Sequence, residues 1–208
     1  MTTALLVIDM QNGFCHRNGS IPSLVGPLVA NDRVVRRNVE ALDRARVLNM
    51  PVIFTRHCWD KSMIDAGLSF TDPIVEADRE MARQLREFGA LIQGSWDADV
   101  VDELAPIDGE FVVDKPRYDA FLGTRLEQIL RGLRVDELIV TGVVTNVCVE
   151  STTRSGYMRD YRMTVISDCV TAQTPELHDN ALMAMESGRF ARVAPLDEIA
   201  EMQLAVAA

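Results

Sequence analysis

Three side chains that can do chemistry each follow a short apolar run of the sequence. They are Asp9 after residues 4–8, Lys115 after residues 111–113 and Cys148 after residues 138–142. Continuous apolar runs are typical of strands that are buried on both faces of a parallel sheet. Because open parallel sheets bind ligands outside the carboxyl ends of their strands, we expect the three groups to meet at one edge. Together they supply a nucleophile, a proton carrier and a charge that supports both.

Each of the three residues also has an ordinary interpretation. An aspartate at a strand end often caps a turn, and a single lysine is usually a surface residue. A cysteine between Val147 and Val149 is usually a small buried hydrophobe. The placement of all three residues at one predicted sheet edge favours the catalytic interpretation.

The surroundings of Cys148 favour a nucleophilic role. Residues 142–146 leave the strand in a turn, and residues 148–153 can open a helix. The positive end of a helix dipole stabilises a thiolate. The first backbone N–H groups of a helix have no intrahelical partner, so they can hold an oxyanion.

The remaining pattern predicts the scaffold that positions these residues. Apolar runs predict strands at 4–8, 51–55, 111–113, 138–141, 163–166 and 190–193. Helical spacing at 34–48 and 122–133 lies between them, which predicts a three-layer αβα fold. We expect a Rossmann-like open parallel sheet of about six strands with helices on both faces. Residues 1–208 form one predicted domain, with an irregular loop insertion at 57–110 that suits a lid or binding loop.

Composition excludes several classes of function. The 208 residues include 21 Lys and Arg against 31 Asp and Glu, a net charge of −10, with no basic run, so we expect no nucleic-acid partner. There is no apolar run of roughly 20 residues and no signal-peptide pattern, so we expect no membrane association. The four cysteines lack paired spacing, which argues against structural zinc and a disulfide framework. A cytoplasmic protein is the resulting expectation.

Three motifs resemble those of the isochorismatase-like cysteine hydrolases. They lie at 5–12, 114–118 and 141–152, and the likeness runs from residue 4 to about 185. The resemblance implies a catalytic triad of Asp9, Lys115 and Cys148. It also implies a cis peptide between Val143 and Val144, and an oxyanion site built from the backbone N–H groups of Val144 and Cys148.

The presence of Cys148 points to the amidohydrolase branch of this family, because isochorismatase itself has no nucleophilic cysteine. Nicotinamidases of that branch carry an Asp-x-His metal motif after the second strand. This chain has Thr-Arg-His-Cys-Trp-Asp at 55–60 instead, so we predict no metal and no cofactor.

Within the branch, the chain most resembles the ureidoacrylate amidohydrolases. The shared features include Trp59, an acid near Asp65 and the stretch from 115 to 152. Phe14, His57 and Asp65 stand where the resemblance leads us to expect Tyr, Asn and Glu, which changes the hydrogen-bonding capacity of the pocket. The residues expected to bind substrate are Phe14, His57, Trp59, Asp65, Arg117 and Tyr118.

The resemblance therefore implies a cysteine-dependent amidohydrolase that cleaves a C–N bond of a small amide or ureide. Asp9 would deprotonate Cys148, and the reaction would pass through a thioester acyl-enzyme. The alternatives within enzymes are a biuret-like, carbamoyl or nicotinamide-type amide. The alternative from another class is a binding protein on a catalytically retired fold. Relatives are usually homodimers or homotetramers, so the chain is expected to be one of these.

Overall fold

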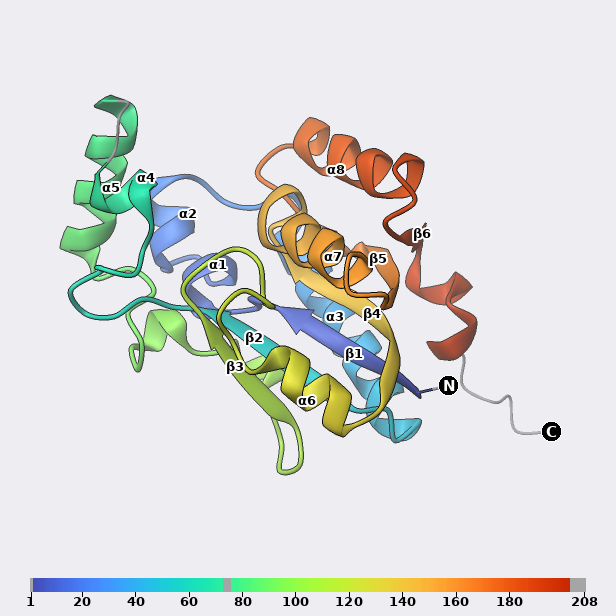
Figure 1. Ribbon diagram of the computed structural model, residues 1–208. Helices are drawn as coiled ribbons and strands as arrows, with labels where there is room; N and C mark the ends of the chain where they lie inside the picture. The colour runs from blue at the N-terminus through green and yellow to red at the C-terminus, as the bar shows by residue number, and fades with distance from the viewer. Residues whose placement is uncertain (1, 73–75, 203–208) are drawn as a thin grey trace.

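Six parallel strands form the centre of the computed structural model, which describes residues 2–72 and 76–202. They are β1 (Thr2–Ile8), β2 (Val52–His57), β3 (Phe111–Lys115), β4 (Val135–Val143), β5 (Arg162–Thr171) and β6 (Arg192–Ala194). Their order across the sheet is β3-β2-β1-β4-β5-β6 (Figure 1). This arrangement confirms the predicted fold class. The strand order runs outward from β1 to β3 on one side and from β4 to β6 on the other, so the order reverses between β1 and β4.

Alternate residues of β1 are buried on opposite faces of the sheet. Leu5 and Val7 belong to one apolar cluster, whereas Leu6 and Ile8 belong to the other. A strand with apolar residues at every position is stable only where both faces are covered. The continuous apolar run of the sequence therefore places β1 in the middle of the sheet.

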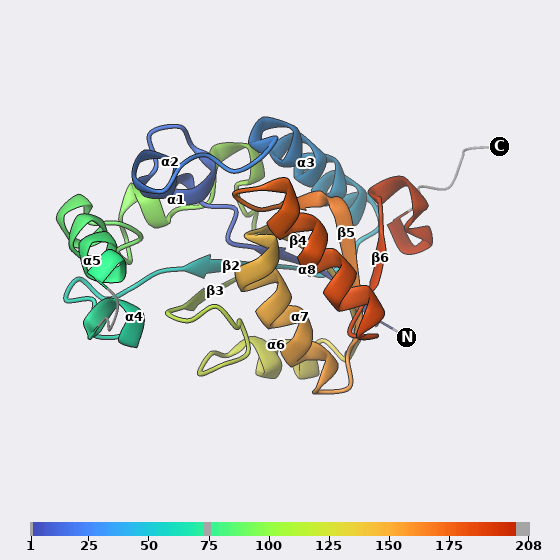
Figure 2. The same cartoon turned by 90° about the horizontal axis from the view of Figure 1, so that it is seen from above.

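Helices cover both faces. Helix α3 (Asn31–Val47) packs on one face, whereas α6 (Leu126–Gly132) and α7 (Glu150–Tyr157) lie on the other (Figure 2). Helix α3 buries Ala41, Leu42 and Ala45, which are spaced for one side of a helix. Helix α8 (Pro175–Ser187) begins with a Thr174 cap and packs beside α7 and the turn that carries Cys148.

The segment 57–110 is partly helical, which differs from the expected irregular insertion. It contains α4 (Leu68–Thr71), α5 (Glu76–Phe88) and two short 3-10 helices, Trp96–Ala98 and Asp102–Leu104. Helix α5 buries only a narrow apolar stripe within a highly charged sequence, so its periodicity is easily overlooked. Two short helices, α1 (Asn12–Cys15) and α2 (Ser20–Leu24), precede α3.

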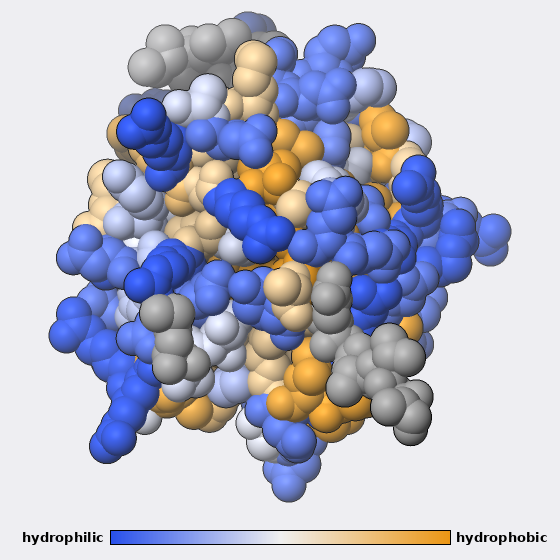
Figure 3. Space-filling model, turned by 90° about the vertical axis from the view of Figure 1, so that its right-hand side faces the viewer, coloured by the Kyte–Doolittle hydropathy of each residue, from blue (hydrophilic) through white to orange (hydrophobic). Residues whose placement is uncertain are grey.

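The described helices include none that is long and apolar enough to cross a membrane. Figure 3 shows the side of the molecule on which the amino terminus lies, where hydrophilic residues cover most of the surface. Apolar groups lie between them in small patches.

Candidate active site

The ends of four neighbouring strands bring the predicted reactive residues together. His57 is the last residue of β2 and pairs in register with Lys115, the last residue of β3. Asp9 follows β1, and Cys148 follows β4 after a short turn. The junction of β1 and β4 is where the strand order reverses, which is the usual ligand position in open α/β sheets.

Asp9 and Lys115 form a completely buried ion pair. Lys115 Nζ lies 2.7 Å from Asp9 Oδ2, and both side chains have 0% exposure. Lys115 Nζ also donates to the main-chain carbonyl of Arg117 at 3.1 Å. Thr55 Oγ1 donates to Asp9 Oδ1 at 2.6 Å, so both carboxylate oxygens are held. A buried charge pair needs such additional hydrogen bonds to offset its loss of hydration.

The ammonium of Lys115 remains charged despite its burial. Burial alone lowers the pKa of Lys115, but the charge and hydrogen bond of Asp9, with a smaller contribution from Cys148, outweigh this effect. The pKa of Lys115 is therefore raised above its usual value. A permanent positive charge lies beside the carboxylate and the thiol.

Cys148 lies in a π-helical turn, Thr145–Val149, that leads into α7. Its side chain is almost completely buried, and burial raises the pKa of the thiol. Lys115 lowers this pKa and Asp9 raises it, but burial is the largest effect. Burial thus opposes the thiolate that the helix start was expected to favour. A thiol with a raised pKa must lose its proton before it can attack.

The turn before Cys148 is held by close backbone packing. The peptide bond between Val143 and Val144 is cis, which confirms what the resemblance implied. Gly142 has φ +108°, and a Cβ atom there would lie 1.9 Å from the carbonyl oxygen of Ile8. Only glycine fits this backbone and this distance. The close contact fixes β4 against β1, and hence Cys148 near Asp9.

Two polar residues outside the predicted set support the same turn. Thr145 is completely buried, and its Oγ1 lies 3.0 Å from Nδ1 of His178 on α8. The pKa of His178 is lowered because the ring is partly buried. Sequence reasoning did not connect these residues, since they are 33 positions apart and only the packing of α8 brings them together.

His57 is buried among aromatic rings. Its ring meets the edge of Trp59 at a centroid distance of 4.9 Å and stacks on Tyr118 at 5.8 Å. Phe14 approaches it edge-on at 6.4 Å. Burial, followed by the charge of Lys115, lowers the pKa of His57 to about 3. The imidazole is therefore neutral, and its Nδ1 atom is buried without a hydrogen-bond partner.

The other residues predicted to bind substrate each have their own contacts within the protein. The Trp59 indole N–H donates to the carbonyl of Pro116 at 3.2 Å, so its ring is fixed. Arg117 is half-buried beside Gly67, at the start of α4. The carboxylate of Asp65 accepts hydrogen bonds from the main-chain N–H of Asp60, at 3.1 and 3.3 Å. The Asp65 carboxylate therefore helps to hold the turn that begins at Asp60.

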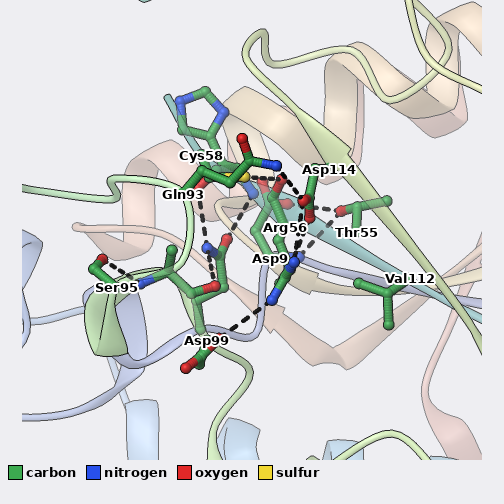
Figure 4. A network of polar contacts seen from close by, with 12 residues as sticks. Asp9, Thr55, Arg56, Cys58, Gln93, Ser95, Asp99, Val112 and Asp114 are labelled. Atoms are coloured by element: carbon green, nitrogen blue, oxygen red, sulfur yellow. Dashed lines mark hydrogen bonds and ion pairs between the residues drawn. The ribbon is translucent and has the colours of Figure 1, made fainter. Parts of the chain in front are cut away.

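A second polar network fixes the end of β2. The buried Gln11 side chain donates to the carbonyl of His57 at 3.0 Å and accepts from its N–H at 2.7 Å. Arg56 makes two hydrogen bonds with Asp114, at 2.7 and 3.0 Å. Figure 4 shows Arg56 between Asp114 and Asp99, with Asp9 and Thr55 nearby. These contacts set the position of His57 relative to the neighbouring strands.

Asp9, His57 and Cys148 offer donor atoms that all lie within 4.8 Å of one another. This grouping includes donor types that bind zinc, although the sequence spacing gave no indication of it. Asp9 already accepts hydrogen bonds from Lys115 and Thr55, and the ammonium of Lys115 would repel a cation here. The same geometry suits acyl transfer, since a thiol, a carboxylate and a fixed positive charge surround one small volume.

Comparisons with known proteins identify relatives of this chain. Residues 3–198 match the isochorismatase domain family. The ureidoacrylate amidohydrolase RutB of Stutzerimonas stutzeri is 34% identical over 198 residues, covering 94% of this chain and 80% of that protein. A cysteine hydrolase structure from Pseudomonas syringae pv. phaseolicola has a TM-score of 0.79 and 27% identity, covering 96% and 91% of the two chains. The structure of N-carbamoylsarcosine amidase from Thermoplasma acidophilum has a TM-score of 0.72 and 26% identity, covering 96% of this chain and 99% of that one.

Proposed function

The chain belongs to the isochorismatase family, and we propose that it hydrolyses a small ureide by nucleophilic attack of Cys148. Its relatives make it an amidohydrolase, which is a hydrolase of C–N bonds. The observation that carries the finer proposal is the buried cluster itself. The Cys148 thiol lies within 4.8 Å of the Asp9 carboxylate, and Lys115 is ion-paired to that carboxylate.

The reaction begins with a proton transfer. Asp9 takes the proton of the Cys148 thiol, and the thiolate forms a bond to the substrate carbonyl carbon. The backbone N–H groups of Val144 and Cys148 stabilise the oxyanion. As the C–N bond breaks, Asp9 gives its proton to the leaving nitrogen. Lys115 stabilises the negative charge on both reacting groups.

Water completes the cycle. Asp9, again a carboxylate, removes a proton from a water molecule that attacks the thioester carbon. The C–S bond breaks, the acid product leaves, and the proton returns to the Cys148 sulfur. The proposal requires no metal and no cofactor.

The names of two relatives support a ureide as substrate. Ureidoacrylate and N-carbamoylsarcosine both carry a carbamoyl group on nitrogen and a carboxylate tail. In this chain the carbonyl of such a molecule lies over Cys148, and Phe14, Trp59 and Tyr118 form apolar walls around His57. Arg117 is the charged group proposed to meet the tail. A cytoplasmic homodimer or homotetramer completes the proposal.

Turnover of a compound panel tests this function. Purified enzyme is given ureidoacrylate, N-carbamoyl amino acids, biuret and nicotinamide, and ammonia release is measured. We expect the carbamoyl compounds to be hydrolysed with the highest kcat/KM, and mass spectrometry of the quenched enzyme to find the acyl group on Cys148. Hydrolysis of nicotinamide alone would contradict the ureide, and an unmodified Cys148 during turnover would contradict the nucleophile.

A further inference from the structure

His57 is an unusual neighbour for a nucleophile, because it is a neutral imidazole with unused hydrogen-bonding capacity. One of its ring nitrogens lies within 4.8 Å of both the Asp9 carboxylate and the Cys148 sulfur. Its pKa is lowered to about 3 by burial and by Lys115, so the ring takes up no proton at the pH values at which most enzymes work. It cannot serve as a proton carrier there. It can serve as a hydrogen-bonding group with one donor and one acceptor nitrogen.

The surroundings of the ring leave one of its nitrogens without a partner. Nδ1 of His57 is buried and meets no hydrogen-bond partner among the described residues. Such a buried polar atom is costly unless a ligand supplies the missing hydrogen bond. Lys115, the nearest cation, already donates to Asp9 and to the Arg117 carbonyl.

Aromatic contacts keep the ring in this orientation. Trp59 contacts His57 with an interplanar angle of 80°, and its own N–H is bonded to Pro116. Tyr118 stacks on the ring at 28°. A ring held from two sides presents a fixed acceptor, which discriminates between ligands better than a mobile one.

We infer that His57 accepts a hydrogen bond from the N–H of the leaving nitrogen, and so restricts the enzyme to ureides that carry this N–H. The inference rests on the proposed function. His57 ends β2, between the strand end that carries Asp9 and the strand end that carries Lys115. A carbonyl carbon that the Cys148 sulfur attacks has its substituents within reach of the His57 ring, because a ring nitrogen lies within 4.8 Å of that sulfur.

This hydrogen bond has a consequence for the chemistry. When the N–H of the leaving nitrogen points at the His57 imidazole, the lone pair of that nitrogen points away from the imidazole and towards Asp9. Asp9 delivers its proton to this lone pair as the C–N bond breaks. A substrate with oxygen in place of N–H puts a lone pair against the lone pair of His57. A substrate with an N-methyl group, such as N-carbamoylsarcosine, has no hydrogen to donate.

The test compares two substrates that differ in one atom, N-carbamoylglycine and O-carbamoylglycolate. Release of glycine or glycolate is measured for the wild type, His57→Phe and His57→Asn. Phenylalanine keeps a planar ring without an acceptor, and asparagine restores an acceptor through its amide oxygen. The ratio of kcat/KM for the two substrates in each variant is divided by the wild-type ratio, which removes the intrinsic difference in reactivity between them.

We expect His57→Phe to lower kcat/KM for N-carbamoylglycine by about tenfold or more, while the value for O-carbamoylglycolate changes by less than about threefold. His57→Asn should recover most of the selectivity. Equal losses on both substrates in a folded His57→Phe protein would overturn the inference and leave His57 a packing residue. If the wild type instead hydrolyses neither compound but cleaves other amides through Cys148, the proposed ureide function itself has failed.

Discussion

Lys115 and His57 are register partners at the ends of β3 and β2, and burial together with the charge of Lys115 keeps His57 neutral. The pKa of Lys115 is raised, whereas the pKa of His57 is lowered to about 3. Of these two neighbouring basic side chains, one is therefore charged and the other neutral. Lys115 is a permanent cation for the reacting groups, and His57 is an uncharged surface for the substrate.

Replacing Cys148 with alanine removes the proposed nucleophile. We expect kcat to fall by at least about a thousandfold with the fold intact, because no other group forms the acyl-enzyme. Cys58→Ala is the matched control, since Cys58 is a buried cysteine outside the cluster, and it should retain most activity. Activity above a few per cent of wild type in Cys148→Ala would refute the assignment.

Replacing Lys115 with methionine leaves the Asp9 carboxylate buried without its cation. We expect the free energy of unfolding to fall by about 3–5 kcal/mol, because the uncompensated charge is more costly than the loss of the ion pair. Urea unfolding at neutral pH measures the effect. Arg83→Met, which breaks an exposed ion pair on α5, should have a much smaller effect on stability, because solvent screens exposed charges. Similar losses in the two variants would contradict the buried pair.

The lowered pKa of His57 predicts a loss of stability in acid. The unfolded chain binds a proton at this residue below its usual pKa of 6.5, whereas the folded protein does not until about pH 3. Stability is therefore fully present above pH 6.5 and declines by about 1.4 kcal/mol for each pH unit between these values. His57→Gln should remove that slope in urea titrations at several pH values. His16→Gln, at an exposed residue, should leave it unchanged.

Tyr118→Phe probes binding rather than chemistry. The Tyr118 ring stacks on His57 at the edge of the site and is 45% exposed. We expect KM to rise more than kcat falls, because the hydroxyl contributes equally to ground-state and transition-state binding. Steady-state kinetics on a ureide separates the two parameters. An unchanged KM with kcat reduced about a hundredfold would move Tyr118 into the catalytic machinery.

Chelation tests the expectation that no metal takes part. After dialysis against EDTA the enzyme should retain its activity on a ureide, because Asp9 and Cys148 supply the proton acceptor and the nucleophile. The metal content of the dialysed protein is measured in parallel. Loss of activity that zinc or manganese restores would assign a metal role to the grouping of Asp9, His57 and Cys148.

The strand pattern of the sequence was sufficient to predict the sheet and the meeting of Asp9, Lys115 and Cys148. Each of these residues follows a buried strand, so the topology alone brings them to one edge. The contacts of Thr55 and Gln11 could not be predicted in this way. They depend on which side chain faces which across 46 residues, and periodicity does not contain that information.

The direction of the pKa shift of Cys148 could not be predicted from the sequence either. Its place near a helix start favoured a thiolate, but the depth of burial is a property of the whole fold. The contact of Asp65 could not be predicted from the sequence either. Its carboxylate accepts a hydrogen bond from the main-chain N–H of Asp60, and nothing in the residue types indicated this contact.

The depth of the catalytic centre has a practical consequence for covalent inhibitors. Asp9 and Lys115 have no exposed surface, and Cys148 has 3%. Bulky maleimides and other large thiol-directed labels will modify the protein slowly, whatever the electrophilicity of their reactive group. A useful warhead must be flat and small enough to follow the route of the substrate, with an electrophilic carbon in place of the scissile carbonyl. Molecular size, more than intrinsic reactivity, will determine which compounds inactivate this enzyme.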